Sequence, residues 1–354
     1  MQSAADGVKS KMKKHVNIPI FIPHYGCPNA CVFCNQKKIT GKPCYDRVSV
    51  RSEIDEALST VDFENTEVEL AFFGGSFTAI PREEMLGLLE ISDEYLNCGK
   101  ISAVRLSTRP DAISDEILDI LSLHGVKTVE LGLQSFSDRV LTASKRGHTS
   151  ELSEKACKAV KKHGFKLIGQ MMVGLPSSTV TDEVMTAEKI CALGADGARV
   201  YPTVVFPETE LKQMEKSGIY SPMSIEESIE RTAEVLEVFA RRGIPVIRIG
   251  LCANETLAEA GYSENYHPSV GELSLNRMYL KAMRALLNQN KEKRGDTAVF
   301  TVAYGKISQA VGQKKSNILT LKKECGLKNI KITESPDITG FRLTLQITDE
   351  RTQN

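Results

Sequence analysis

Cys27-Pro-Asn-Ala-Cys31-Val-Phe-Cys34 is the stretch that decides the fold, because it places three thiols on one short loop. It follows an apolar run over residues 18–22 and a small segment, 23–26, so we expect the loop at the end of a strand. Four thiolates would complete a closed zinc or iron–sulfur site, whereas three leave one metal position open. An open position on iron is a place for chemistry. The spacing therefore predicts a reactive metal centre.

Simpler interpretations of the three cysteines remain open. His24 or Cys44 could complete a zinc site, or the thiols could carry no metal. Zinc ribbons and knuckles usually pair C-x2-C with a second pair of ligands further on, and none follows here. A disulfide framework is not expected, because nine cysteines are an odd number and no secretory signal precedes them. His148 and His163 lie beside predicted helices and are expected to be solvated. The spacing favours iron–sulfur over zinc.

The composition is that of an ordinary globular protein. The 354 residues are 41% hydrophobic and 25% charged, and the net charge is zero, so the whole molecule has no field that would steer a polyanion. No apolar stretch reaches the length of a membrane span, and we expect no membrane partner. Residues 1–16 read as a basic arm. So many unpaired cysteines predict a reducing, cytoplasmic location.

Short β-branched runs alternate with amphipathic helical patterns along most of the chain. The predicted strands cover residues 17–22, 67–72, 103–107, 128–133, 166–172, 197–201 and 245–249. The predicted helices cover residues 51–60, 82–95, 114–123, 151–163, 181–193 and 225–241. This alternation means parallel strands joined by crossovers, which predicts an α/β fold with a partial (β/α)6-type TIM barrel over residues 17–250.

Beyond residue 250 the alternation stops. Residues 251–296 are expected to form a helical cap or connector, with a helix over residues 273–289. Residues 297–354 read as strand, helix, loop, helix, strand and strand. This order predicts a small α+β C-terminal appendage.

Unusual turns or polar residues follow six consecutive predicted strands. They are the cysteine loop, Gly74-Gly75-Ser76-Phe77-Thr78, Ser107-Thr-Arg-Pro-Asp111, Gln134-Ser-Phe136, Gly174-Leu-Pro176 and Tyr201-Pro-Thr203. Barrels build their sites at the C-terminal ends of the strands. We therefore expect these segments to meet in one functional site.

Several of these residues also have a purely structural interpretation. Gly74-Gly75 exposes backbone groups that could bind a ligand's ammonium or carboxylate, but a lone Gly-Gly is more often a tight turn. Gln134 could bind a sugar hydroxyl and Arg146 a carboxylate, although a single Gln is usually exposed and a single Arg usually forms a surface salt bridge. Gln170 is more informative, because an amide inside an apolar strand must find partners.

These motifs together resemble the radical S-adenosylmethionine (SAM) superfamily. The cysteine spacing, with an aromatic residue before the third cysteine, and the Gly-Gly loop carry the resemblance. Further motifs narrow it to the radical domain of the Elongator catalytic subunit, a branch related to oxygen-independent coproporphyrinogen oxidase. These motifs are Arg105-Leu-Ser-Thr-Arg-Pro-Asp111, Val129-Glu-Leu-Gly-Leu-Gln-Ser135, Arg146-Gly-His148, Val173-Gly-Leu-Pro176 and Arg199-Val-Tyr-Pro-Thr203. The resemblance spans residues 18–249.

The resemblance implies two cofactors and the residues that hold them. Cys27, Cys31 and Cys34 would bind a [4Fe–4S] cluster, and SAM would bind the fourth iron. The residues that would contact SAM are Gly74, Gly75, Ser76, Thr78, Ser107, Gln134, Arg146 and Gln170. An electron from a low-potential donor of the flavodoxin or ferredoxin type would cleave SAM and yield a 5′-deoxyadenosyl radical.

The sequence departs from the Elongator pattern in two ways. Ser107 stands where that pattern has a carboxylate, which puts the expected ribose contact in doubt. The Elongator subunit also carries an acetyltransferase domain after its radical domain, and this chain ends before such a domain. We therefore do not expect acetyl transfer to carry over.

The C-terminal segment carries a separate signal for nucleic acid. Residues 291–331 hold ten Lys or Arg and three Asp or Glu, a net charge of +7 in a neutral protein. Val311-Gly312-Gln-Lys-Lys-Ser-Asn-Ile318 resembles the loop of a shortened KH module, in which G-x-x-G clamps single-stranded backbone. Lys315 replaces the second glycine, and Gly312, Lys314 and Lys315 are the expected RNA contacts. A basic solvated face explains the same charge equally well.

We therefore expect a cytoplasmic radical SAM enzyme that modifies RNA, with a tRNA base as the substrate. A small molecule, as in the porphyrinogen-oxidising relatives, is the alternative substrate. A non-catalytic iron–sulfur or zinc protein that binds RNA is the alternative class of function.

Overall fold

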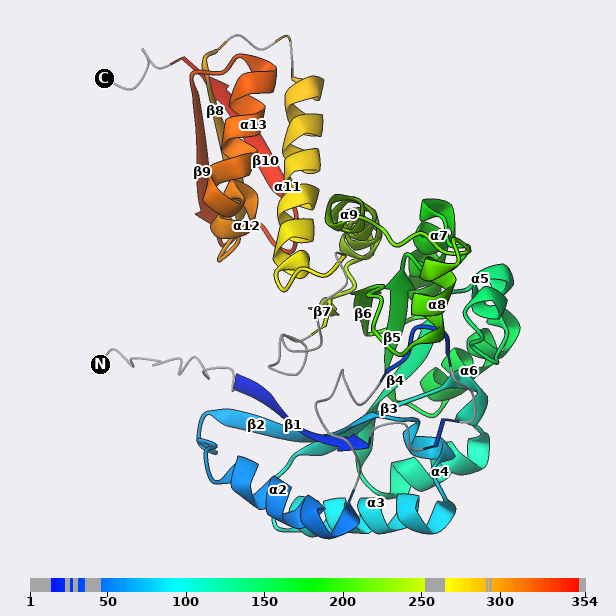
Figure 1. Cartoon of the computed structure of the whole chain (residues 1–354). Coiled ribbons are helices and arrows are strands. Elements are labelled where there is room, and N and C mark those ends of the chain that lie inside the picture. Colours follow the sequence, from blue (N-terminus) through cyan, green and yellow to red (C-terminus); the bar gives the residue numbers. More distant parts are fainter. Residues whose placement is uncertain are drawn as a thin grey trace, which may run out of the picture.

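A computed structural model of the chain describes residues 14–22, 26–27, 31–35, 46–251, 265–290, 292 and 295–349. Within these ranges the chain forms a seven-stranded sheet and a three-stranded sheet, which lie in the lower and upper parts of Figure 1. The candidate zinc ligands His24 and Cys44 lie outside the described residues, as does most of the basic arm. No helix in the described part has the length and apolarity needed to cross a membrane.

The larger sheet consists of parallel strands that pair in the order of the sequence. They are β1 (Lys14–Ile22), β2 (Thr66–Gly74), β3 (Ala103–Thr108), β4 (Val126–Gln134), β5 (Lys166–Val173), β6 (Gly197–Pro202) and β7 (Val246–Ile249). Within the described residues β1 pairs only with β2 and β7 only with β6, so the barrel is open. The predicted α/β partial barrel is confirmed, and the strand predicted at residues 245–249 forms the short β7.

Helices cover the convex face of this sheet (Figure 1). The main ones are α2 (Val50–Leu58), α3 (Arg82–Asn97), α4 (Asp115–Leu123), α6 (Ser150–Lys162), α7 (Val180–Ala192) and α9 (Ile225–Arg242). Two shorter helices, α5 (Asp138–Ala143) and α8 (Glu210–Lys216), lie within the loops that follow β4 and β6. The sequence patterns missed both, because helices of six or seven residues are too short to show a period.

Alternation along each strand separates the core from the site. On β3, Val104 and Leu106 face the helices and join the main apolar core. Arg105, between them, faces the concave side, where it contacts acidic side chains of β2 and β4. The concave face therefore carries the polar residues of the barrel.

The smaller sheet has the order β10-β8-β9, with β8 and β9 parallel and β10 antiparallel to β8. Its strands are β8 (Thr297–Ala303), β9 (Asn329–Ser335) and β10 (Leu343–Thr348), with α12 (Ile307–Val311) and α13 (Ser316–Cys325) between β8 and β9. The order of elements is the one predicted from the sequence. A long helix, α11 (Val270–Gln289), packs on this sheet and supplies Tyr279, Leu280, Met283 and Leu287 to its core.

Helices α9 and α11 are joined by a row of ion pairs. Arg277 of α11 contacts Glu226 and Glu230 of α9, each at 2.5 Å. Lys281, one turn further along α11, contacts Glu230 at 3.2 Å and also pairs with Glu234. This row ties the appendage to the last long helix of the barrel, and Figure 1 shows α11 next to α9.

Candidate functional site

The cysteine loop is fixed to the barrel on two sides. Val32, between Cys31 and Cys34, donates its backbone N–H to Ser144 O at 3.2 Å, and its carbonyl accepts from Leu211 N at 2.8 Å. Its side chain is buried in a small apolar cluster with residues of the segment from β6 to α8. The loop is thus held at the end of the barrel where the strands finish.

Cys31 is the most buried of the three thiols, with 8% of the residue exposed, while Cys27 and Cys34 are half-buried. The guanidinium of Arg146 donates from Nη1 to Cys31 Sγ at 3.4 Å. Burial raises the pKa of the Cys27 thiol, and the positive charges of Arg146 and Arg109 offset only part of that rise. The site thus brings cations to the thiols, and a bound metal would complete their deprotonation.

The three thiols do not converge on one point. Among the described residues, no three His, Cys, Asp or Glu side chains lie close enough together to hold a metal ion. A [4Fe–4S] cluster is larger than an ion, and each of its thiolates binds a different iron. Separated thiols on one loop therefore suit a cluster better than a single zinc ion.

Gln134, at the end of β4, is buried in a strained backbone conformation. Its φ is +65°, it is 4% exposed, and its side-chain Oε1 has no hydrogen-bond partner. Arg146 Nη2 donates to Gly132 O at 2.7 Å, and a Cβ on Gly132 would lie 2.7 Å from that nitrogen and 3.1 Å from Gln134 Nε2. Glycine at 132 therefore makes room for both side chains. Backbone strain beside an unsatisfied buried amide is typical of a ligand site.

Ser76 and Thr78 contact protein atoms rather than open space. Thr78 Oγ1 lies 2.6 Å from Thr108 Oγ1 and donates to Ala112 O at 2.6 Å. Ser76 Oγ accepts from Arg109 N at 3.2 Å. These bonds attach the loop after β2 to the loop after β3. Ser76 and Thr78 therefore hold these loops in place.

The other predicted SAM contacts lie on or beside the concave face. Gly74 ends β2 with φ +107°, a conformation that favours glycine, and Gly75 next to it is half-buried. Ser107 and Gln170 are half-buried on β3 and β5. The structure thus brings the strand-end segments after β2, β3, β4 and β5 to one edge of the barrel, together with the cysteine loop.

Three residues of this edge were missed as site residues. Arg109 is 2% exposed and pairs with Asp111 through Nε at 2.8 Å and Nη2 at 2.7 Å. His148, predicted to be solvated, is instead buried beside Arg146, and burial together with that positive charge lowers its pKa to about 4. His148 is therefore a neutral imidazole at neutral pH. In the sequence, only the Arg-x-Asp spacing at a strand end indicated the Arg109–Asp111 pair.

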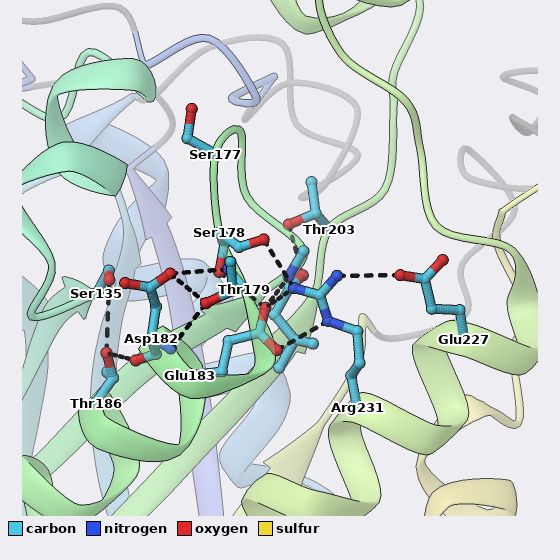
Figure 2. Close-up of polar contacts among 12 residues, drawn as sticks. Ser135, Ser177, Ser178, Thr179, Asp182, Glu183, Thr186, Thr203, Glu227 and Arg231 are labelled. Carbon is cyan, nitrogen blue, oxygen red and sulfur yellow. Dashed lines mark hydrogen bonds and ion pairs between the residues drawn. The ribbon is translucent and has the colours of Figure 1, made fainter.

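A second ion pair fixes the loop after β5 (Figure 2). Glu183 of α7 accepts from Gly174 N at 2.6 Å, from Ser178 Oγ at 2.9 Å and from Arg231 of α9 at 2.6 Å. Tyr220 donates its hydroxyl to Gly174 O at 2.8 Å. Both backbone groups of Gly174 are thus occupied, and the start of the Gly174-Leu-Pro176 turn is bonded to α7 and to Tyr220.

Deeper on the concave face, four charged side chains neutralise one another. Arg105 contacts Glu69 at 2.7 Å and Glu130 at 3.1 Å, and Arg199 contacts Glu130 at 2.6 Å. The Arg199 guanidinium also lies over the ring of Phe73, 5.0 Å from its centroid. This charge network lies on the concave face of the barrel, below the strand ends.

The predicted RNA contacts lie far along the chain in the appendage. Gly312 has φ +78°, and Lys314 and Lys315 follow with φ +53° and +63°, so two successive lysines are left-handed. Both are exposed at the start of α13. Tyr304, at the end of β8, is 76% exposed.

Comparison with known proteins adds family evidence. The model of the radical SAM superfamily matches residues 21–190, and that of the radical SAM C-terminal domain matches residues 195–281. An uncharacterized protein of Methanocaldococcus jannaschii is 28% identical over 242 residues, which make up 65% of this chain and 74% of that protein. The tRNA uridine(34) acetyltransferase of Methanocaldococcus infernus is 31% identical over 195 residues, 49% of this chain and 36% of that protein.

A solved structure shares the fold. The Methanocaldococcus infernus Elp3 with an N-terminal deletion superposes with a TM-score of 0.56 at 19% identity, over 80% of this chain and 69% of that one. An open barrel with three cysteines after its first strand defines an enzyme built around an iron–sulfur cluster. The two matched models together span most of the barrel, and the chain belongs to the radical SAM superfamily. Its cofactors are those of the family, a [4Fe–4S] cluster and SAM.

The described residues fit these cofactors. Three separated thiols with a cation against one of them suit a cluster. Buried polar atoms without a hydrogen-bond partner surround them, namely Gln134 Oε1, Arg146 Nε, Arg109 Nη1 and His148 Nε2. Buried polar groups are normally satisfied, so four such atoms at the edge that carries the cysteine loop suit a polar ligand that would complete their hydrogen bonds.

Proposed function

We propose that this enzyme uses radical SAM chemistry to modify RNA, with a tRNA base as the target. The proposal rests on one observation, the exposed basic appendage attached to a radical SAM barrel. A relative of the barrel, the tRNA uridine(34) acetyltransferase of Methanocaldococcus infernus, is named for action on tRNA. When bound, the cluster and SAM supply a 5′-deoxyadenosyl radical that abstracts hydrogen from a substrate.

Different residues at the strand ends hold the cluster and SAM. Cys27, Cys31 and Cys34 bind the cluster. Arg146 and Gln134 offer buried donors and an acceptor to the carboxylate and nucleoside of SAM, and Ser76 and Thr78 act from behind by fixing the loop after β2. The remaining proposed SAM contacts are Gly74, Gly75, Ser107 and Gln170. Radical SAM enzymes need a reductant, and we propose a flavodoxin or ferredoxin.

The appendage offers two features that suit single-stranded RNA. The side chains of Lys314 and Lys315 are exposed next to each other, and their ammonium groups can contact successive phosphates. Tyr304 exposes its ring next to Gly305 and Lys306, where a base can stack on it. These features support a shortened KH-like surface that contacts RNA through Gly312, Lys314 and Lys315.

The test is tRNA binding by gel shift at several salt concentrations, with reversal of both lysines, K314E/K315E. We expect at least tenfold weaker binding and a shallower dependence on salt, because two phosphate contacts are lost. The matched control, K155E/K158E on α6, changes the net charge equally on the barrel exterior and should leave binding almost intact. If both variants lost tRNA binding equally, the attraction would be unspecific. If neither variant lost tRNA binding, this surface would be excluded as the RNA contact.

A small-molecule substrate is the second candidate. It is supported by the absence of net charge on the whole chain, which gives the barrel no long-range attraction for RNA. Release of 5′-deoxyadenosine by the loaded enzyme, unchanged when cellular tRNA is added or removed, would favour it.

A further inference from the structure

Arg109, just after β3, carries one of the most buried charges at the strand-end edge. Its guanidinium pairs with both oxygens of Asp111, and Nη2 also donates to Arg146 O at 2.9 Å. Its Nη1 is buried and has no partner. A guanidinium that is 2% exposed and still has an unused donor is unusual, because each such donor loses its bond to water on burial.

Arg109 is connected to the cysteine loop through Arg146. Arg109 bonds the backbone of Arg146, and the side chain of Arg146 reaches Cys31 Sγ at 3.4 Å. With His148 neutral, two guanidiniums and one carboxylate leave this edge with a single excess positive charge.

We propose that Arg109 and Asp111 form an electrostatic pair that sets the reduction potential of the cluster held by Cys27, Cys31 and Cys34. In this pair Arg109 favours the reduced cluster and Asp111 limits that effect. The inference rests on membership of the radical SAM superfamily and is independent of whether the substrate is RNA.

The physical basis is the charge change on reduction. One electron passes from a low-potential one-electron donor to the cluster, and no bond or proton is moved. The cluster becomes more negative by one unit, so a fixed positive charge nearby stabilises the reduced form and a negative charge destabilises it. Buried charges act more strongly than exposed ones, because the medium around them has a low dielectric constant.

A purely structural role for Arg109 predicts a different result. If Arg109 only braced the backbone of Arg146, removing either member of the pair would disturb the same bonds, and both changes would act in one direction. If charge is what matters, R109Q and D111N must shift the potential in opposite directions. The sign of the two shifts therefore separates the two roles.

The experiment is a potentiometric titration of the reconstituted holoenzyme without SAM, followed by the EPR signal of the reduced cluster, with iron content measured for each variant. We expect R109Q to lower the equilibrium constant for reduction about tenfold, which is about 59 mV for one electron. D111N should raise it, and R109K should stay near the wild-type value. K145Q removes an exposed charge beside Arg146 and serves as the control with no expected shift.

Shifts of the same sign in R109Q and D111N, or no shift in either, would overturn the proposal. If R109Q does not retain the cluster, D111N alone decides, since it keeps a side chain of the same shape. A raised potential in D111N then supports the proposal, and an unchanged or lowered one refutes it. Failure of tRNA binding affects none of these outcomes.

Discussion

The concave face of the barrel carries buried charges at two levels, and the levels differ in how they are paired. In the charge network of Glu69, Arg105, Glu130 and Arg199, every charged side chain has a partner of opposite sign, and the one buried atom without a hydrogen bond, Arg199 Nε, still lies 2.6 Å from Glu130 Oε2. At the strand-end edge, Arg109, Gln134 and Arg146 each keep a buried polar atom without a hydrogen bond. Polar groups whose hydrogen bonds are satisfied within the protein stabilise the fold, whereas unsatisfied polar groups are available to bind a ligand.

The largest expected effect is the loss of the cluster itself. Replacing Cys31 by Ser removes the most buried thiolate of the strand-end edge, and we expect loss of iron and complete loss of 5′-deoxyadenosine release under reducing conditions. Iron analysis and chromatography of the reaction products measure both. The control is Cys325→Ser, an exposed cysteine of the appendage, which should keep the cluster and the product. Full iron content in C31S would contradict the assignment.

The second-largest expected effect concerns the charge network, where a substitution should change the stability of the protein alone. Replacing Glu130 by Ala leaves Arg199 without its counter-ion and leaves Arg105 paired with Glu69 alone. Breaking a buried ion pair in this way destabilises a protein by about 3–5 kcal/mol. Urea unfolding of the metal-free protein measures it. Glu94→Ala, which breaks an exposed pair with Arg51, should change little. Equal stability of E130A and the parent would show that the charge network is not structural.

The third prediction concerns Gln134, where stability and binding should change in opposite directions. Glycine at this position removes a left-handed strain of about 1 kcal/mol, so Q134G should unfold at equal or higher urea concentration than the parent. The same change removes a buried amide, and we expect SAM to bind about tenfold more weakly, which is about 1.4 kcal/mol. Isothermal titration calorimetry on the cluster-loaded protein measures this affinity. Unchanged affinity would remove Gln134 from the site.

The smallest effect is a pH dependence from His148. Its pKa is lowered to about 4 in the folded protein, by burial and by the charge of Arg146, with Arg109 acting in the same direction and Asp111 opposing. The unfolded chain therefore binds a proton more readily between pH 6.5 and pH 4, and folding stability falls as the pH drops through this range. From pH 7.5 to pH 5.5 the loss is about 1 kcal/mol. His148→Gln should lose that part of the slope in urea unfolding, and an identical slope would contradict the burial of a neutral imidazole.

Most of the fold could be predicted, because it follows from periodicity. The strands and long helices show two different hydrophobic periods, and Ser114 stands at the start of α4 and accepts the N–H of Ile117 at 3.2 Å. The position of the site at the strand ends followed from the barrel rule and needed no knowledge of contacts.

The residues that the sequence did not reveal depend on contacts between distant segments. Nothing in the sequence of β3 and β4 says that Arg105 meets Glu130, since pairing across strands depends on the register. His148 was expected to be solvated, because it lies beside a predicted helix, yet helix α6 and the site bury it. The conformation of Gln134 was also invisible, since no residue type announces a left-handed turn except glycine and asparagine.

Helix α11 limits how the two halves of the protein could be separated, both in the laboratory and in evolution. Its Met278 belongs to the core of the barrel and its Tyr279 to the core of the appendage, so a single continuous helix serves both. A truncation at residue 296 would leave Leu280, Met283 and Leu287 bare, and a truncation before residue 270 would remove the partners of the α9 glutamates. An exchange of appendages between relatives of this protein would have had to include α11 and a matching face on α9. The two parts therefore do not form independent modules in this structure.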